Sequence, residues 1–164
     1  MSTTNFQRLI ALLAEARVEF VVIGGLAATV HGSAYVTQDV DICYNRSPEN
    51  IERLCKALEV VRPRLRGVPS DLPFRLDPPT IRAGLNFTLD TDLGALDLLG
   101  EVSPFGEYNE VVKSSEMAEL FGLQVPVLSL EALIQAKRAA GRRKDLLLLP
   151  ELEALLELKK RPPE

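Results

Sequence analysis

Hydrophobic residues recur along the chain with two different periods, and the two periods predict helices and strands in alternation. Apolar residues at helical spacing predict an amphipathic helix over residues 4–16. Short β-branched or alternating runs predict strands at 20–23, 36–44, 85–89, 95–99 and 123–128. Helix-forming stretches with capping residues predict further helices at 26–31, from Ser47-Pro48 onward, at 129–140 and at 142–158.

The turn residues between these elements indicate the fold class. Asp92-Leu93-Gly94 lies between two predicted strands and is typical of a hairpin. Residues 62–80 are rich in Pro and Arg and predict a surface loop that ends in one short helical turn at Asp77-Pro78-Pro79. Because several strands are linked by hairpins, we expect an α+β fold, a mixed β-sheet with flanking helices and a C-terminal helical pair, and not a doubly wound parallel sheet.

The length predicts a single domain. The chain has 164 residues, so we expect one domain over 1–164, with a core at about 18–128 and C-terminal helices at about 129–158. The leucine-rich stretch of the last helix is expected to be buried, and 159–164 to be a frayed tail.

Net charge and cysteine content indicate the kind of partner and the cellular compartment to expect. The net charge of −4 argues against a protein coated in nucleic acid, although a local basic patch lies near the C-terminus. Two cysteines and one histidine do not complete a zinc set, so we expect free thiols in a reducing cytosol. Charged residues interrupt the N-terminal apolar run, and glycines break the uncharged stretch 21–38. A cytoplasmic protein without membrane contact is expected.

Three aspartates are candidate metal ligands. Asp39 and Asp41 are two residues apart on a predicted strand, so their carboxylates point to the same face and repel unless a cation lies between them. Asp97 lies between two leucines of another predicted strand, where an unpaired carboxylate is costly. Oxygen ligands favour Mg²⁺ or Mn²⁺. Taken singly, an Asp-x-Asp pair is often a solvated strand edge, and a lone Asp more often makes an ordinary hydrogen bond.

Gly24-Gly25 is a candidate phosphate loop, because it ends one predicted strand and opens a helix. Glycine lets backbone approach a phosphate closely, and a helix N-terminus offers free N–H groups. About half of such pairs are plain turns. Together with three carboxylates and two metal ions, the loop would suit an in-line attack on an α-phosphate.

The segment from Val22 to Ile42, which includes Gly-Gly-Leu-Ala, His-Gly and Thr-Gln-Asp-Val-Asp, resembles the signature of the nucleotidyltransferase superfamily, which includes DNA polymerase beta. It is most similar to small bacterial members grouped with the AbiEii-type toxins and the minimal nucleotidyltransferases. Two departures concern the triphosphate contacts. Gly25 stands where many members have Ser, and Tyr35 stands where many relatives have Arg.

The resemblance implies roles for particular residues. The metal ligands would be Asp39, Asp41 and Asp97, with Asp97 also a base for the attacking hydroxyl, and the nucleotide would contact Gly24, Gly25 and Thr37. The segment from Leu133 to Asp145 is similar to a Lys-then-Arg-x-Lys-Asp segment of the AbiEii-like group. By that similarity, Lys137 belongs to the catalytic set and neutralises triphosphate charge, Arg142 assists it, and Asp145 orients both. Read alone, residues 137–144 are a basic patch of the kind that usually faces solvent.

We therefore expect an enzyme, a metal-dependent nucleotidyltransferase that moves a nucleoside monophosphate from an NTP to a hydroxyl acceptor. The acceptor would be a tRNA, a protein or a small molecule. The expectation includes an enzyme that acts as the toxin of a toxin–antitoxin pair, with a cognate antitoxin or another protein as its partner. The alternative is a non-catalytic nucleotide-binding partner module of such a system. A metal-dependent phosphatase or nuclease would also use clustered carboxylates, but the Gly-Gly turn favours the transferase. His31 is interpreted as a helix-end cap in preference to a polar residue lining the site.

Overall fold

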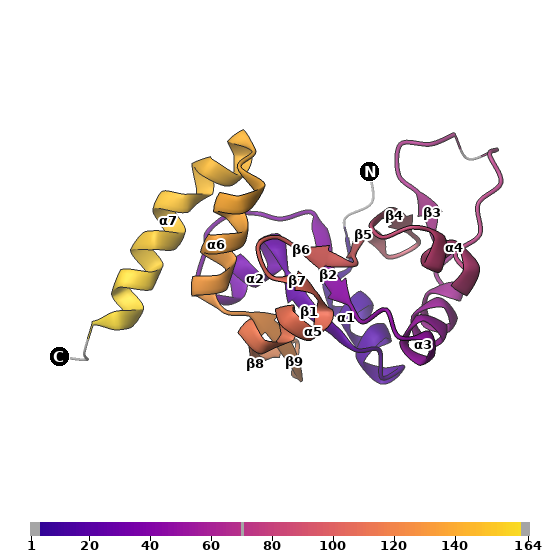
Figure 1. Ribbon diagram of the computed structural model, residues 1–164, viewed down its shortest axis with the longest axis horizontal. Coiled ribbons are helices and arrows are strands. Elements are labelled where there is room, and N and C mark those ends of the chain that lie inside the picture. Colours follow the sequence, from indigo (N-terminus) through magenta and orange to yellow (C-terminus); the bar gives the residue numbers. More distant parts are fainter. Residues whose placement is uncertain (1–3, 70, 162–164) are drawn as a thin grey trace.

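A seven-stranded mixed sheet forms the centre of the computed structural model, which describes residues 4–69 and 71–161 (Figure 1). The strand order is β3-β4-β5-β2-β1-β9-β8, and a separate two-stranded sheet pairs β6 with β7. The strands are β1 (Phe20–Ile23), β2 (Asp39–Tyr44), β3 (Arg64–Leu65), β4 (Phe87–Thr91), β5 (Gly94–Leu99), β6 (Glu101–Val102), β7 (Gly106–Glu107), β8 (Ser115–Leu120) and β9 (Leu123–Leu128). The predicted α+β class is confirmed.

The helices begin and end at residues that the sequence marks. Ser47 and Ser129 cap two helix N-termini by accepting hydrogen bonds from Asn50 N and Ala132 N, and Gly141 ends a helix with a φ of 63°. The helices are α1 (Phe6–Glu15), α2 (Gly24–Val30), α3 (Pro48–Glu59), α4 (Pro78–Ala83), α5 (Tyr108–Val111), the 3₁₀ helix η1 (Val112–Ser114), α6 (Leu130–Ala140) and α7 (Arg143–Lys160).

Strand pairing places two chain segments that are far apart in sequence next to each other. β2 and β5 run parallel, with Asp41 directly opposite Asp97, while β1 and β2 run antiparallel. β4 and β5 form the antiparallel hairpin predicted around Asp92-Leu93-Gly94. On β2, Val40 and Ile42 are fully buried in the core, so the alternation along the strand turns Asp39 and Asp41 to the other face.

Two strands of the sheet were not predicted. β3 lies within residues 62–80, which were interpreted as a loop, and it pairs antiparallel with β4. β8 pairs antiparallel with β9 at the opposite edge of the sheet. β3 has only two residues, too few to show a period, and β8 leaves Glu116, Met117 and Glu119 exposed, so neither gives a clear alternation. β2 also begins at Asp39, three residues later than expected.

The prediction that the leucine-rich stretch of the last helix is buried is wrong in part. Leu146 and Leu147 are 50% and 72% exposed, while Leu152 is fully buried. Four consecutive leucines go once around a helix, and α7 packs on α6 along one side only (Figure 1). Helical structure continues to Lys160, beyond the expected end, and residues 162–164 of the expected tail lie outside the described residues. Over the described residues, none of the helices combines the length and the apolar character needed to cross a bilayer.

Candidate active site

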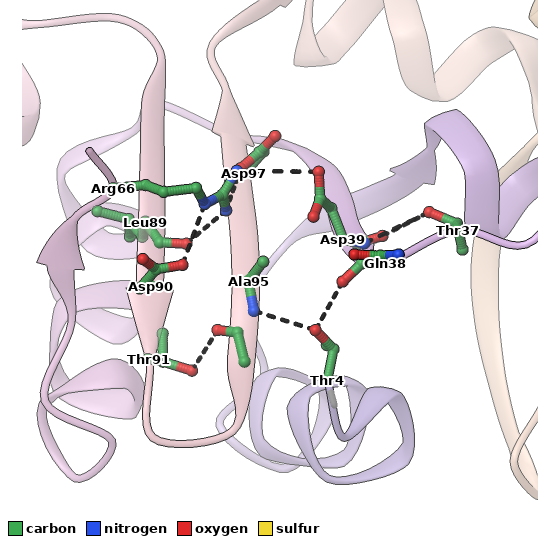
Figure 2. Close-up of polar contacts among 11 residues, drawn as sticks. Thr4, Thr37, Gln38, Asp39, Arg66, Leu89, Asp90, Thr91, Ala95 and Asp97 are labelled. Atoms are coloured by element: carbon green, nitrogen blue, oxygen red, sulfur yellow. Dashed lines mark hydrogen bonds and ion pairs between the residues drawn. The ribbon is translucent and has the colours of Figure 1, made fainter. Parts of the chain in front are cut away.

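Three carboxylates converge on one face of the sheet. Asp39 and Asp41 project from the same side of β2, and the parallel register sets Asp97 of β5 beside Asp41. One ligand oxygen from each of the three lies within 4.8 Å of the others. Figure 2 shows Asp39 and Asp97 reaching toward each other from the two neighbouring strands. The structure therefore brings together all three aspartates singled out in the sequence.

The electrostatics of this cluster centre on Asp41. Burial, followed by the neighbouring Asp97 carboxylate, raises the pKa of Asp41 to about 7 from an ordinary 3.8. Its Oδ1 atom is buried and has no hydrogen-bond partner among the described residues. Burial also raises the pKa of Asp97, while the Arg66 guanidinium opposes that shift. An orphaned carboxylate oxygen inside an anionic cluster is the position that a bound cation would satisfy.

The glycine pair packs directly on this cluster. Gly24 has a φ of 66°, and a Cβ atom there would collide with the Asp41 carboxylate. At Gly25, a Cβ atom would lie 2.6 Å from Thr37 Oγ1. The Thr37 hydroxyl itself donates to the Asp39 carbonyl (3.1 Å) and accepts from the Asp39 amide (3.4 Å), so it shapes the start of β2. Both glycines are therefore required by close approach and not only by a turn.

Two cations from the α6–α7 junction extend toward the carboxylates. Asp145 is fully buried, and it accepts hydrogen bonds from Lys137 Nζ at 3.2 Å and from Arg142 Nε at 2.6 Å. The Lys137 charge lowers the pKa of Asp41, and Asp41 contributes to the raised pKa of Arg142 after the larger effect of the Asp145 hydrogen bond. The Lys137 side chain is only 13% exposed, so the general interpretation of residues 137–144 as a solvated face is wrong for this lysine.

Sequence reasoning missed Arg66. Its side chain reaches across β4 to the carboxylate cluster, with Nη2 donating to Asp97 Oδ1 at 2.8 Å and Nη1 lying 3.8 Å from Asp39 Oδ2 (Figure 2). Its Nε donates to Asp90 Oδ1 at 3.0 Å. The alternate spacing of Arg62, Arg64 and Arg66 was visible in the sequence, but with β3 only two residues long it does not establish a strand.

His31 lies apart from the carboxylates. It is the C-cap residue of α2, as preferred from the sequence, and its backbone N–H bonds the last turn of that helix. Its Nε2 atom is 2.8 Å from the Leu128 carbonyl oxygen, and Nδ1 is 3.8 Å from Glu116. The side chain thus ties α2 to the β8–β9 edge of the sheet.

Comparisons with known proteins show what fold this is. The sequence matches no protein-family model and no curated protein. Among solved structures, it is similar over 97% of its length to TM1012 of Thermotoga maritima, described as a candidate nucleotidyltransferase, with 18% identity, 98% of that chain covered and a TM-score of 0.53.

Two proteins that were solved with an antibiotic or an adenylylated antibiotic are similar over nearly their whole chains. The lincosamide antibiotic adenylyltransferase LnuA, solved with lincomycin, matches over 94% of this chain and 99% of its own, with 14% identity and a TM-score of 0.62. ANT(2")-Ia, solved with adenylyl-2"-tobramycin, matches over 93% and 95%, with 19% identity and a TM-score of 0.55. The chain therefore has the fold of these nucleotidyltransferases.

Proposed function

We propose that the chain is a metal-dependent nucleotidyltransferase, built as one domain, that moves a nucleoside monophosphate from an NTP to a hydroxyl acceptor. The observation that carries this proposal is the cluster of Asp39, Asp41 and Asp97 with the orphaned Asp41 Oδ1 at its centre. The fold shared with adenylyltransferases and the glycine backbone packed on Asp41 support it. A phosphatase or nuclease would account for the carboxylates but not for that glycine contact.

The donor set fits Mg²⁺ or Mn²⁺. All three ligands are carboxylates, and no cysteine or histidine is among them, which suits a hard cation. Asp39, Asp41 and Asp97 would hold the metal. When bound, the metal would supply charge neutralisation at the reacting phosphate and would lower the pKa of the attacking hydroxyl.

The remaining residues would bind and orient the nucleotide. Lys137 and Arg142 would neutralise triphosphate charge from positions fixed by Asp145, and backbone at Gly24 and Gly25 would approach the phosphates. The acceptor oxygen would form a bond to the α-phosphorus as the bond to the departing pyrophosphate breaks. The hydroxyl proton would pass to Asp97, whose ionised form the adjacent Arg66 favours.

The acceptor class that the structural neighbours favour is a small hydroxyl compound. LnuA and ANT(2")-Ia are named for action on antibiotic molecules, and their lengths match this chain closely, which favours a small hydroxyl compound. The AbiEii-type subgroup and a toxin role rest on the sequence resemblance alone. A tRNA or protein acceptor, and a cognate antitoxin as partner, therefore stand as outcomes of the test below.

The test is incubation of the purified chain with α-labelled NTPs and Mg²⁺ or Mn²⁺, with cellular RNA, protein and small-molecule fractions supplied separately. We expect label to enter one fraction with wild-type protein and to be lost with Asp97→Asn. Asp92→Asn is the matched control, because Asp92 pairs with Arg62 at 2.7 Å and lies outside the carboxylate cluster. Equal labelling by wild type and Asp97→Asn would reject the proposed mechanism, and the labelled fraction would identify the acceptor class.

A further inference from the structure

Arg66 is a cation held inside the carboxylate cluster by contacts that do not depend on that cluster. Its backbone N–H donates to the Thr88 carbonyl oxygen at 2.9 Å, its Nη2 donates to the Leu89 carbonyl oxygen at 2.6 Å, and its Nε donates to Asp90 at 3.0 Å. All three partners belong to β4, and Figure 2 shows two of them, Leu89 and Asp90. The guanidinium is therefore fixed by the neighbouring strand, and its remaining donors point at Asp97 and Asp39.

The contacts of Arg66 are divided unevenly over the three carboxylates. Asp97 receives a short hydrogen bond and Asp39 an ion pair, while no described contact joins Arg66 to Asp41. Oδ1 of Asp41 is the oxygen left without a partner. Arg66 thus neutralises the Asp39 and Asp97 side of the cluster and makes no contact with Asp41.

We propose that Arg66 is a resident counter-cation that competes with the divalent metal for Asp97 and Asp39. This inference rests on the metal site of the proposed function. Without metal, Arg66 offsets the repulsion among the three carboxylates. With metal, the ion binds against a positive charge that β4 holds within 4 Å of two of its ligands, which lowers metal affinity in the free protein.

The expected size of the effect follows from proton binding. An arginine beside an aspartate lowers the proton affinity of that carboxylate by about 1–3 pKa units, or roughly ten- to a thousandfold. A divalent ion carries twice the charge of a proton, but the Arg66 side chain is 28% exposed and solvent screens part of the field. We therefore expect removal of the charge to tighten metal binding by about tenfold or more.

The experiment is a calorimetric titration of the full chain with Mn²⁺ alone, without nucleotide, for wild type, Arg66→Gln and Arg64→Gln. Arg64 is the matched control, because it belongs to the same strand segment but pairs with Asp92 at 3.4 Å and not with the cluster. Arg66→Gln should bind Mn²⁺ about tenfold tighter than wild type, and Arg64→Gln should stay within about threefold. Metal-free Arg66→Gln should also melt at a lower temperature and gain more from Mn²⁺ than wild type.

Arg66→Lys separates competition from positioning, and it serves alone if Arg66→Gln does not fold. The lysine keeps the charge, so competition predicts an affinity within about threefold of wild type, whereas a role for the planar fork in holding Asp97 predicts a clear loss. A Mn²⁺ affinity of Arg66→Gln that equals or falls below that of wild type would overturn the inference.

The double variant Asp39→Asn with Asp41→Asn distinguishes failure of this inference from failure of the proposed metal site. If that double variant binds Mn²⁺ like wild type, the proposed metal site itself is wrong; if it loses binding while Arg66→Gln is unchanged, only the competition is wrong.

Discussion

Asp41→Asn should stabilise the metal-free protein at alkaline pH, although a core substitution ordinarily destabilises. The folded pKa of about 7 lies above the unfolded value of 3.8, so between these values the folded state holds a proton that the unfolded state has lost. The stability that this proton contributes is fully present below about pH 4, and it declines as the pH rises through 7. Above pH 7 the ionised carboxylate is buried at full cost.

The magnitude follows from the size of the shift. About 3 pKa units correspond to a ceiling near 4 kcal/mol, since one unit is worth 1.36 kcal/mol. Asp97 shares the proton and the site is partly open to solvent, so we expect roughly 1–3 kcal/mol at pH 8. For a chain of this length, that corresponds to an increase of about 3–10 °C in melting temperature. An asparagine side chain has nearly the same shape as aspartate and carries no charge, so the substitution removes the buried charge without leaving a cavity.

The assay is thermal unfolding in EDTA from pH 4.5 to 8.5. The advantage of Asp41→Asn should be largest at pH 8 and should shrink steadily toward pH 4.5. Asp92→Asn is the control with the opposite sign, because the Arg62 hydrogen bond lowers the pKa of Asp92, and its stabilisation is therefore present at high pH and lost on acidification. A less stable Asp41→Asn at pH 8, or an advantage that does not change with pH, would refute the reasoning.

Two further substitutions probe the residues around the cluster. Gly24→Ala should cost about 1–3 kcal/mol and should abolish Mn²⁺ binding in calorimetry, because its Cβ would displace the Asp41 carboxylate and its φ of 66° is strained for alanine. Lys137→Met should weaken ATP binding in equilibrium dialysis. It should also cost about 1–3 kcal/mol in denaturant unfolding, because buried Asp145 loses a charged partner. A change in binding with no change in stability would mean that Arg142 alone satisfies Asp145.

The parts of the site that could be predicted from sequence depend on local periodicity. Asp39 and Asp41 alternate with the buried Val40 and Ile42 along one strand, so their shared face follows from the backbone alone. The Gly24-Gly25 break after a buried strand marked the turn, but the collision that excludes a side chain at Gly24 depends on how β2 places the Asp41 carboxylate beside it. That Asp97 belongs with the other two came from the resemblance and from its apolar neighbours, because no local signal specifies that β5 runs parallel to β2.

The position of Arg66 and the burial of Lys137 depend on long-range packing. Arg66 reaches the cluster only because a two-residue strand pairs with β4, and a pair that short carries no period of its own. Lys137 reads as solvated on a basic helix end, and its burial follows from the packing of α6 against α7. For Arg66 the charge was visible in the sequence but its partners were not, whereas the resemblance had already given Asp145 as the residue that orients Lys137.

Each cation near the cluster has an anchoring acid that is not one of the three candidate metal ligands. Asp90 holds Arg66 from β4, and Asp145 holds Lys137 and Arg142 at the α6–α7 junction. Because these anchors are separate, the positive charges keep their positions whether the three carboxylates are bare, protonated or bound to a cation. An anionic substrate would then meet a field that is already oriented, without the cost of rearranging side chains at the moment of binding. Through Asp90 and Asp145, residues beside β3 and residues of the α6–α7 junction thereby contribute positive charge to one site.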